Sequence, residues 1–256
     1  MNKPNFSMAS VLLGVLVTAS FTSDCSAKNT AALDPPSRET RYHFLLFWKQ
    51  SDVATSQAKQ TLDAFAARRD GQLIITDIRV GDPARQDLVK KYGVSRAPMP
   101  LVLAVAPNGA VTTAIMHPID DKKLAEAIVS SASSDCLKGI QDGKIVFVCV
   151  NRQRTKAEQS AFEGVYQFAA DDNYSKATQI VRVDPSDPQE GAFLKQLKID
   201  PRTTSPVTVM VAPSGGMLGK YEGPTTKAEF VKTLTASKSS CCPGGKCGPE
   251  GCCPKK

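Results

Sequence analysis

The chain contains 256 residues, 41% of them hydrophobic and 22% charged, which is the composition of a globular protein with one or two domains. Its formal net charge of +7 would suit a nucleic-acid ligand if the basic residues formed one block. They occur instead as short pairs where helix surfaces are expected, such as Arg68-Arg69, Lys90-Lys91 and Lys122-Lys123. We interpret these pairs as solvated helix faces and expect no nucleic-acid partner.

The N-terminal residues have the pattern of a secretory signal peptide. Lys3 gives the start a positive charge, and the apolar run Met8–Ala19 has the length of a signal-peptide core, which is short for a membrane span. The sequence Cys25-Ser26-Ala27 then fits a small-x-small cleavage site. We therefore expect a signal peptide over residues 1–27 and a linker over residues 28–40.

This leader predicts the location of the mature protein. A lipid anchor on Cys25 is the competing interpretation, but Asp24 stands where a lipidation site has a small neutral residue. No later segment is apolar over the length of a membrane helix, so we expect no integral membrane protein after signal cleavage. The expected location is the periplasm or the extracellular medium, where disulfides can form.

Beyond the linker, the apolar pattern predicts the same series of elements twice. Unbroken apolar runs at residues 44–48 and 145–150 predict strands that are covered on both faces. A helix, a second strand, a short helix, a β-hairpin and a closing helix follow in each half. We expect Asp120 and Thr226 to cap the closing helices, with Glu229 completing a capping box.

The later part of the series repeats at constant spacing. Four turn residues recur 106 positions further on, in the pairs Pro100 and Pro206, Pro107 and Pro213, Gly109 and Gly215, and Pro118 and Pro224. This register predicts an internal duplication. The expected fold class is α/β, with two tandem three-layer α/β/α domains at residues 41–131 and 135–237. Their junction is expected in the small polar stretch Ser130–Asp135, and a disordered Cys-rich tail is expected at residues 238–256.

The element order, the Phe-Trp pair that ends the first strand and the later stretch KKYGVSRAPMPLVLAVAPNGAV resemble the thioredoxin-like family. The resemblance covers residues 42–130 and, more weakly, residues 139–237. It implies that Met99-Pro100 and Ser205-Pro206 are cis peptides, in loops that lie beside a bound peptide. The alternative is that each proline only shapes a tight loop.

The chain departs from this family at the redox motif. The resemblance places the two cysteines of Cys-x-x-Cys on Asp52 and Thr55, and the buried acid of the family on Leu46. The matching stretch of the second half, VNRQRTKAEQ, contains no cysteine either. Ser51 or Asp52 can still cap the following helix. The sequence therefore predicts that both halves keep the fold and lack the usual thiol chemistry.

Four further residues could carry chemistry. His43 and His117 have no cluster of cysteines or acids at metal-ligand spacing, so we interpret both as structural or surface residues. Cys149 lies in an apolar run and is interpreted as an inert core thiol. The sequence leaves open a disulfide between Cys136 and Cys149, because it does not give their geometry.

The tail concentrates most of the thiols. Its cysteines are Cys241, Cys242, Cys247, Cys252 and Cys253, and the intervening Gly and Pro residues exclude a helix. Clustered thiolates are soft donors that suit Cu(I) or Zn(II), although the pairwise spacing of structural zinc sites is only partly met. Two alternatives stay open: disulfides or crosslinks, and mobile redox thiols on a tether.

The sequence as a whole predicts an exported binding or scaffolding protein with an unidentified protein or peptide partner. It is expected to be redox-inactive at the usual sites and to bind a soft metal ion through its tail, and the sequence leaves open whether it is an enzyme. The alternative is a thiol-disulfide oxidoreductase or isomerase that uses the tail cysteines.

Overall fold

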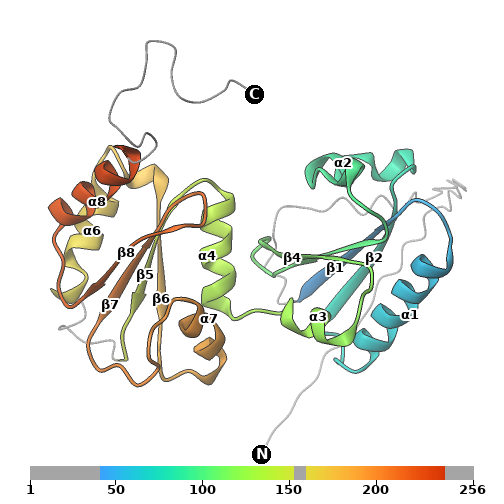
Figure 1. Cartoon of the computed structure of the whole chain (residues 1–256), viewed down its shortest axis with the longest axis horizontal. Coiled ribbons are helices and arrows are strands. Elements are labelled where there is room, and N and C mark those ends of the chain that lie inside the picture. Colours follow the sequence, from blue (N-terminus) through green and yellow to red (C-terminus); the bar gives the residue numbers. More distant parts are fainter. Residues whose placement is uncertain (1–40, 153–159, 240–256) are drawn as a thin grey trace, which may run out of the picture. The chain divides into compact units, whose positions relative to one another are not determined.

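The computed structural model describes residues 41–152 and 160–239 (Figure 1). The expected signal peptide, linker and tail cysteines lie outside these residues. No helix within the described ranges combines the length and the apolar character needed to cross a membrane.

The first sheet contains four strands in the order β2-β1-β3-β4. The strands are β1 (Tyr42–Trp48), β2 (Leu73–Arg79), β3 (Leu101–Val105) and β4 (Val111–Met116). Strand β2 runs parallel to β1, whereas β3 is antiparallel to both β1 and β4. The unbroken apolar run in β1 reflects its central position, because all side chains from Phe44 to Phe47 are buried.

Helices cover both faces of this sheet. They are α1 (Val53–Ala67), α2 (Gln86–Lys91) and α3 (Asp121–Glu126). Phe44 and Leu46 of β1 pack with Leu62 of α1 and Leu124 of α3, while the alternate residue Phe47 packs on the face that α2 covers. The first domain therefore has the expected three layers, and Asp120 caps α3 by accepting the Lys123 N–H at 2.9 Å.

The second sheet repeats this arrangement in the order β6-β5-β7-β8. Its strands are β5 (Ile145–Val150), β6 (Thr178–Val183), β7 (Val207–Val211) and β8 (Met217–Glu222). Strand β6 is parallel to β5, and β7 is antiparallel to β5 and β8. Each hairpin turns at a glycine with positive φ, at 81° in Gly109 and 85° in Gly215, a conformation that L side chains disfavour.

Helices again form the outer layers. They are α4 (Ser131–Gln141), α6 (Glu163–Ala170), α7 (Gly191–Gln196) and α8 (Lys227–Ser239). Helices α6 and α8 cover one face of the sheet, and α4 and α7 cover the other. The capping box of α8 is formed, since Thr226 N–H donates to Glu229 at 2.8 Å. Short 3-10 helices complete the chain: η1 (Pro83–Arg85), η2 (Val94–Arg96), η3 (Ser175–Ala177) and η4 (Pro188–Glu190).

Both sheets thus combine a parallel strand pair with a following antiparallel hairpin, and each lies between two helical layers. This is the thioredoxin-like arrangement that the sequence predicted, and the α/β fold class is confirmed in both halves.

The stretch in which the junction was expected has regular structure. The stretch Ser130–Asp135 is not a loop but the N-terminus of α4, with Ser130 as the N-cap that accepts the Ser133 N–H at 3.2 Å. The buried carboxylate of Glu190 reinforces this end, because it accepts the Ser130 hydroxyl at 2.6 Å and the Ala132 N–H at 3.2 Å. Serine is typical of both loops and helix caps, and its partner here lies sixty residues away.

The disulfide between Cys136 and Cys149 does not form. Neither cysteine forms a disulfide, and both are buried. Cys136, on α4, packs with Val148 of β5 on one face of the sheet, whereas Cys149 packs with Phe147 and Phe230 on the other face. Because successive strand residues point to opposite faces, the sheet itself separates the two thiols.

Candidate functional site

The candidate site begins at the N-terminus of α1, where the family resemblance places the cysteines. Asp52 is the N-cap of the helix, and its carboxylate accepts the Thr55 N–H at 2.8 Å. The Thr55 hydroxyl is buried and donates to the Gln50 carbonyl at 2.9 Å. The helix therefore starts at the expected residue, with an acceptor and a buried donor at the two positions.

The pKa of Asp52 depends on the groups that surround its carboxylate. Its pKa is lowered, mainly by the hydrogen bond from the Thr55 backbone N–H. His117 also contributes to the lowered pKa of Asp52, so the two side chains lie near each other. Asp52 is exposed, and it carries a negative charge at neutral pH.

Sheet register brings two proline loops to this end of the first domain. Leu101 pairs with Phe47 on one side and with Met116 on the other. The loop before β3 and the loop after β4 therefore leave the sheet beside the end of β1. The peptide bonds Met99-Pro100 and His117-Pro118 are both cis, which confirms the first as expected and adds a second.

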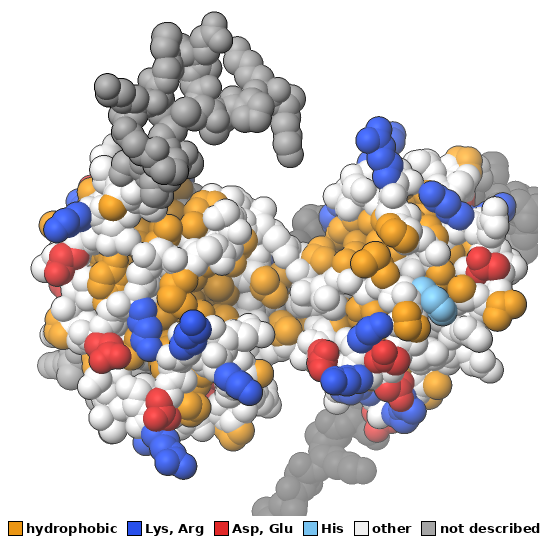
Figure 2. Space-filling view, in the orientation of Figure 1, with side chains coloured by type: hydrophobic (Ala, Val, Ile, Leu, Met, Phe, Trp, Pro, Cys, Tyr) orange, Lys and Arg blue, Asp and Glu red, His pale blue; other side chains and the backbone are white. Residues whose placement is uncertain are grey.

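Apolar side chains are exposed around these loops. Val53 is 73% exposed and Met116 is 53% exposed, whereas Met99 is half-buried and Pro100 is buried. Met116 also lines, together with His117, a surface pocket of about 360 Å³. Figure 2 shows a group of hydrophobic side chains on the visible face of the first domain, bordered by charged residues. We call Asp52, Val53, Met99, Pro100 and Met116 the loop surface.

Trp48 closes the end of β1 in a fixed orientation. Its indole N–H donates to Asp77 on β2. The Lys59 ammonium lies 4.3 Å from the ring centroid and also pairs with Asp77 at 2.5 Å. Arg79 stands 5.9 Å from the same ring. These contacts with two cations and one carboxylate hold Trp48 at the end of the sheet from which α1 departs.

The described part of the second half differs from this site at its proline loop. Ser205-Pro206 is not among the cis peptide bonds of the described residues, so the expectation for this pair was wrong. The segment that corresponds to the start of α1 includes residues 153–159, which lie outside the described part of the chain.

The described thiols lack the properties of nucleophiles. Burial raises the pKa of Cys136 to about 11, so this thiol stays protonated at neutral pH. Cys149 is 2% exposed inside β5. Within residues 41–152 and 160–239, no group of three or more His, Cys, Asp or Glu side chains could hold a metal ion. The tail cysteines lie outside the described residues, and their metal binding stays a prediction.

Sequence reasoning missed Val53, Met116 and the cis bond at His117-Pro118. Val53 is one apolar residue at the start of a helix, and its exposure follows from the fold. Met116 reaches the site only through its pairing with Leu101. The signal available in the sequence was the proline that follows the second hairpin strand.

Comparison with known proteins gives likenesses of fold only. No protein-family model and no curated protein matches the chain. A solved structure of reduced desulfothioredoxin from Desulfovibrio vulgaris Hildenborough is similar at 22% identity and a TM-score of 0.28, covering 34% of this chain and 78% of that chain. Thioredoxin-2 of a malaria parasite is similar at 13% identity and a TM-score of 0.29, covering 34% of this chain and 79% of that chain.

A third structure is similar over both halves. It is the NTD_N/C domain of the alkylhydroperoxide reductase AhpF from Enterococcus faecalis, at 18% identity and a TM-score of 0.28, covering 77% of this chain and 92% of that chain. The fold assignment rests on the strand order and register of this chain. The chain is a protein of thioredoxin-like fold in which Asp52 and Thr55 stand where the resemblance places the redox cysteines.

Proposed function

We propose that the first domain binds an extended protein segment at the loop surface and does not exchange disulfides there. The observation that carries this proposal is the start of α1, where a helix-capping Asp52 and a buried Thr55 take the two cysteine positions beside exposed Val53 and Met116. An exposed apolar group on a fixed framework is typical of interaction surfaces.

The backbone next to Pro100 supports an extended ligand. Within the described residues, the N–H and C=O groups of Met99 have no hydrogen-bond partner, although the next strand begins at Leu101. A peptide that lies alongside can pair with these groups through its own backbone. The side chains of Met99 and Met116 would then contact its apolar residues, since methionine adapts its shape to different partners.

The same geometry argues against thiol chemistry at this position. A disulfide exchange needs a thiolate nucleophile, and neither a carboxylate nor a hydroxyl replaces it. The Asp52 carboxylate is engaged by the Thr55 N–H, and the Thr55 hydroxyl donates to Gln50. The groups that would activate a thiol, the N–H donors at the helix start, stabilise a cap instead.

The binding experiment uses reduced and carboxymethylated ribonuclease A, an unfolded chain without free thiols, as the probe. We expect the full chain to bind it, and we expect the double variant Met99→Lys with Met116→Lys to bind at least tenfold more weakly. Met217→Lys is the matched control, because Met217 is 47% exposed and also lies on the last strand of its sheet. Equal binding by all three proteins would contradict the proposal.

We further propose that the protein is exported. The support is the charged start, the apolar run Met8–Ala19 and the cleavage site that ends at Ala27. N-terminal sequencing of protein from the native compartment should begin at Lys28. A chain that retains residues 1–27 would contradict export, and a lipid on Cys25 would replace cleavage after Ala27 with an anchor on an exported chain.

The tail is proposed to bind a soft metal ion. Five thiols within thirteen residues can surround one small ion, and thiolate is the ligand form, so affinity should fall as the pH falls. A Cu(I) or Zn(II) competition titration should show binding by the reduced full chain and loss of binding in a variant with all five tail cysteines changed to Ser. Equal binding by both would place the metal elsewhere.

The alternative function is thiol-disulfide exchange by the tail. Its support is the same cysteine cluster, which would carry the chemistry that the body lacks. Insulin reduction by dithiothreitol tests this alternative, because turnover by the full chain that disappears when the tail is deleted would favour the enzyme. Mass spectrometry of protein from the native compartment tests the metal site, because tail cysteines that are all in disulfides would exclude it.

A further inference from the structure

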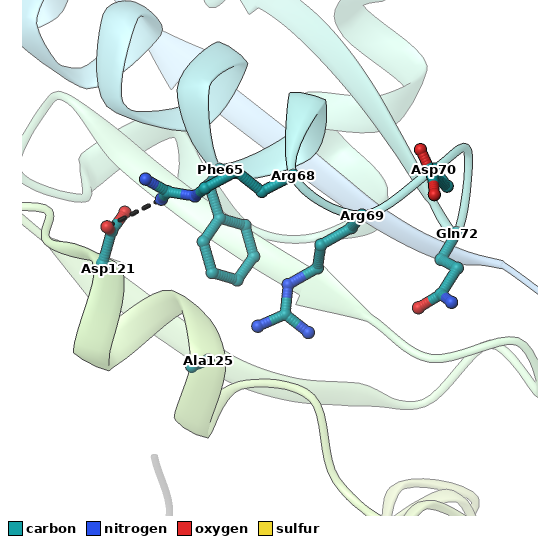
Figure 3. A pocket seen from close by; sticks show the side chains of 7 residues that line it. All are labelled: Phe65, Arg68, Arg69, Asp70, Gln72, Asp121 and Ala125. Atoms are coloured by element: carbon teal, nitrogen blue, oxygen red, sulfur yellow. Dashed lines mark hydrogen bonds and ion pairs between the residues drawn. The ribbon is translucent and has the colours of Figure 1, made fainter.

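The first domain has a pocket at the C-terminal end of α1, whereas the loop surface includes the residues at the N-terminal end of this helix. The end of α1, the turn that precedes β2 and helix α3 border this open surface pocket of about 420 Å³ (Figure 3). This volume falls in the range of small-ligand sites. It is lined by Phe65, Arg68, Arg69, Asp70, Gln72, Asp121 and Ala125.

The two arginines of this pocket differ in their partners. Arg68 donates to Asp121 of α3 at 2.7 Å, which balances its charge. The Arg69 guanidinium lies 4.4 Å from the centroid of the Phe65 ring, and it has no carboxylate partner among the described residues. Arg69 is half-buried and Phe65 is buried, so this cation rests on an apolar floor with part of its hydration removed.

The backbone fixes the position of Arg69. Its N–H donates to Ala66 O at 2.9 Å, and its carbonyl accepts the Gln72 N–H at 2.9 Å. The Gln72 carbonyl in turn accepts the Tyr42 N–H of β1 at 3.2 Å. The turn between α1 and β2 is therefore tied to the sheet, and little ordering of the backbone is needed when a ligand binds.

The side chains around Arg69 leave its guanidinium accessible from the pocket. In Figure 3 the Arg69 guanidinium points into the space between α1 and α3, whereas the Asp70 carboxylate points away from it. The amide of Gln72 lies on the same side of the turn as Arg69 and adds a polar group that can donate.

We infer that this pocket binds an oxyanion, a carboxylate or a phosphate group of a small ligand, through the forked N–H donors of Arg69. A guanidinium stacked on an aromatic ring keeps its N–H edge free, and this planar edge matches the two oxygens of a carboxylate or phosphate. The neighbouring Arg68–Asp121 ion pair closes one side of the pocket and contributes no net charge.

The test is an NMR titration of the isotope-labelled full chain with three probes at constant ionic strength. Benzoate carries a carboxylate, inorganic phosphate carries the other oxyanion, and benzamide is the neutral analogue of benzoate. We expect at least one oxyanion to shift the amide signals of residues 65–72 and 121–125, and we expect benzamide to shift neither group. Comparison of the benzoate and phosphate arms tells which oxyanion the site prefers.

Variants then assign the binding to Arg69. Arg69→Gln should weaken oxyanion binding at least tenfold, and Arg69→Lys should retain an intermediate affinity because it keeps the charge without the fork. Arg96→Gln is the control, since Arg96 is exposed and does not line the pocket. The remaining amide spectrum checks that each variant is folded. Absence of shifts with both oxyanions, equal affinity of the Arg69→Gln variant, or equal binding of benzamide would overturn the inference.

Discussion

The backbone N–H of Thr55 donates a hydrogen bond of 2.8 Å to the carboxylate of Asp52, and this bond joins the two positions at which the family resemblance places redox cysteines. The same N-terminal N–H groups that would stabilise a thiolate here stabilise a carboxylate. The thioredoxin-like framework is thus kept, and the chemistry at its usual position is replaced by a helix cap.

The cap predicts a pH-dependent contribution to stability. The pKa of Asp52 is lowered in the folded state, so its stabilising effect is present above the unfolded pKa and is lost as pH falls through the folded pKa. Asp52→Ala should therefore lower the thermal midpoint at pH values well above 3.8, and the difference should shrink below 3.8. Asp52→Asn, which keeps an acceptor without a charge, should lower it less. An Ala effect that is independent of pH would show that the charge does not contribute.

The helix start also predicts what restored thiols would do. In the double variant Asp52→Cys with Thr55→Cys, the thiol at position 52 should have a depressed pKa because the helix N–H groups stabilise its thiolate. The thiol at position 55 should have a raised pKa, because Thr55 is only 2% exposed. Thiolate absorbance against pH measures both. If both thiols had the pKa of an unperturbed cysteine, the N-terminus of α1 would not lie beside these side chains.

Burial predicts that the two thiols of the body react slowly. Cys136 has a pKa raised to about 11, and Cys149 is enclosed in β5. Iodoacetamide labelling of the reduced native chain near pH 8, followed by peptide mass spectrometry, should leave both unmodified until denaturant is added. If either residue were labelled as fast as an exposed thiol, the core of the second domain would open locally in the native state.

The close packing of α6 predicts one position that tolerates no side chain. A Cβ at Gly164 would lie 2.0 Å from the Thr225 carbonyl oxygen. Gly164→Ala should lower the free energy of unfolding by about 1–3 kcal/mol, the cost of overpacking. Gly191→Ala is the matched control, because Gly191 starts α7 with no atom within 4 Å of a built Cβ. Equal urea midpoints for the two variants would contradict this packing.

Local patterns predicted most of the framework. The apolar runs located β1 and β5, and the spacing of Asp120 and of Thr226 with Glu229 located the caps of α3 and α8. These features depend on neighbouring residues in the chain, and a sequence displays them directly. The repeated Pro and Gly positions predicted that the two sheets share one strand order.

Features that depend on distant partners were not predictable. Helix α4 starts in a serine-rich stretch that matches a loop equally well, and it is fixed by Glu190 and by packing of Cys136 on the second sheet. Met116 enters the candidate site through its register with Leu101. Arg69 is accessible because Asp121 pairs with Arg68 and not with Arg69, and no local sequence pattern predicts which arginine Asp121 contacts.

The central claim is that the first domain binds without exchanging disulfides, and the most direct test is the reduction of insulin by dithiothreitol. The protein to measure is the full chain with Cys241, Cys242, Cys247, Cys252 and Cys253 changed to Ser, which removes the tail thiols and leaves the body intact. We expect this variant to reduce insulin no faster than dithiothreitol alone, and we expect a faster reduction when Asp52→Cys and Thr55→Cys are added. A rate above that background in the variant without added cysteines would contradict the claim.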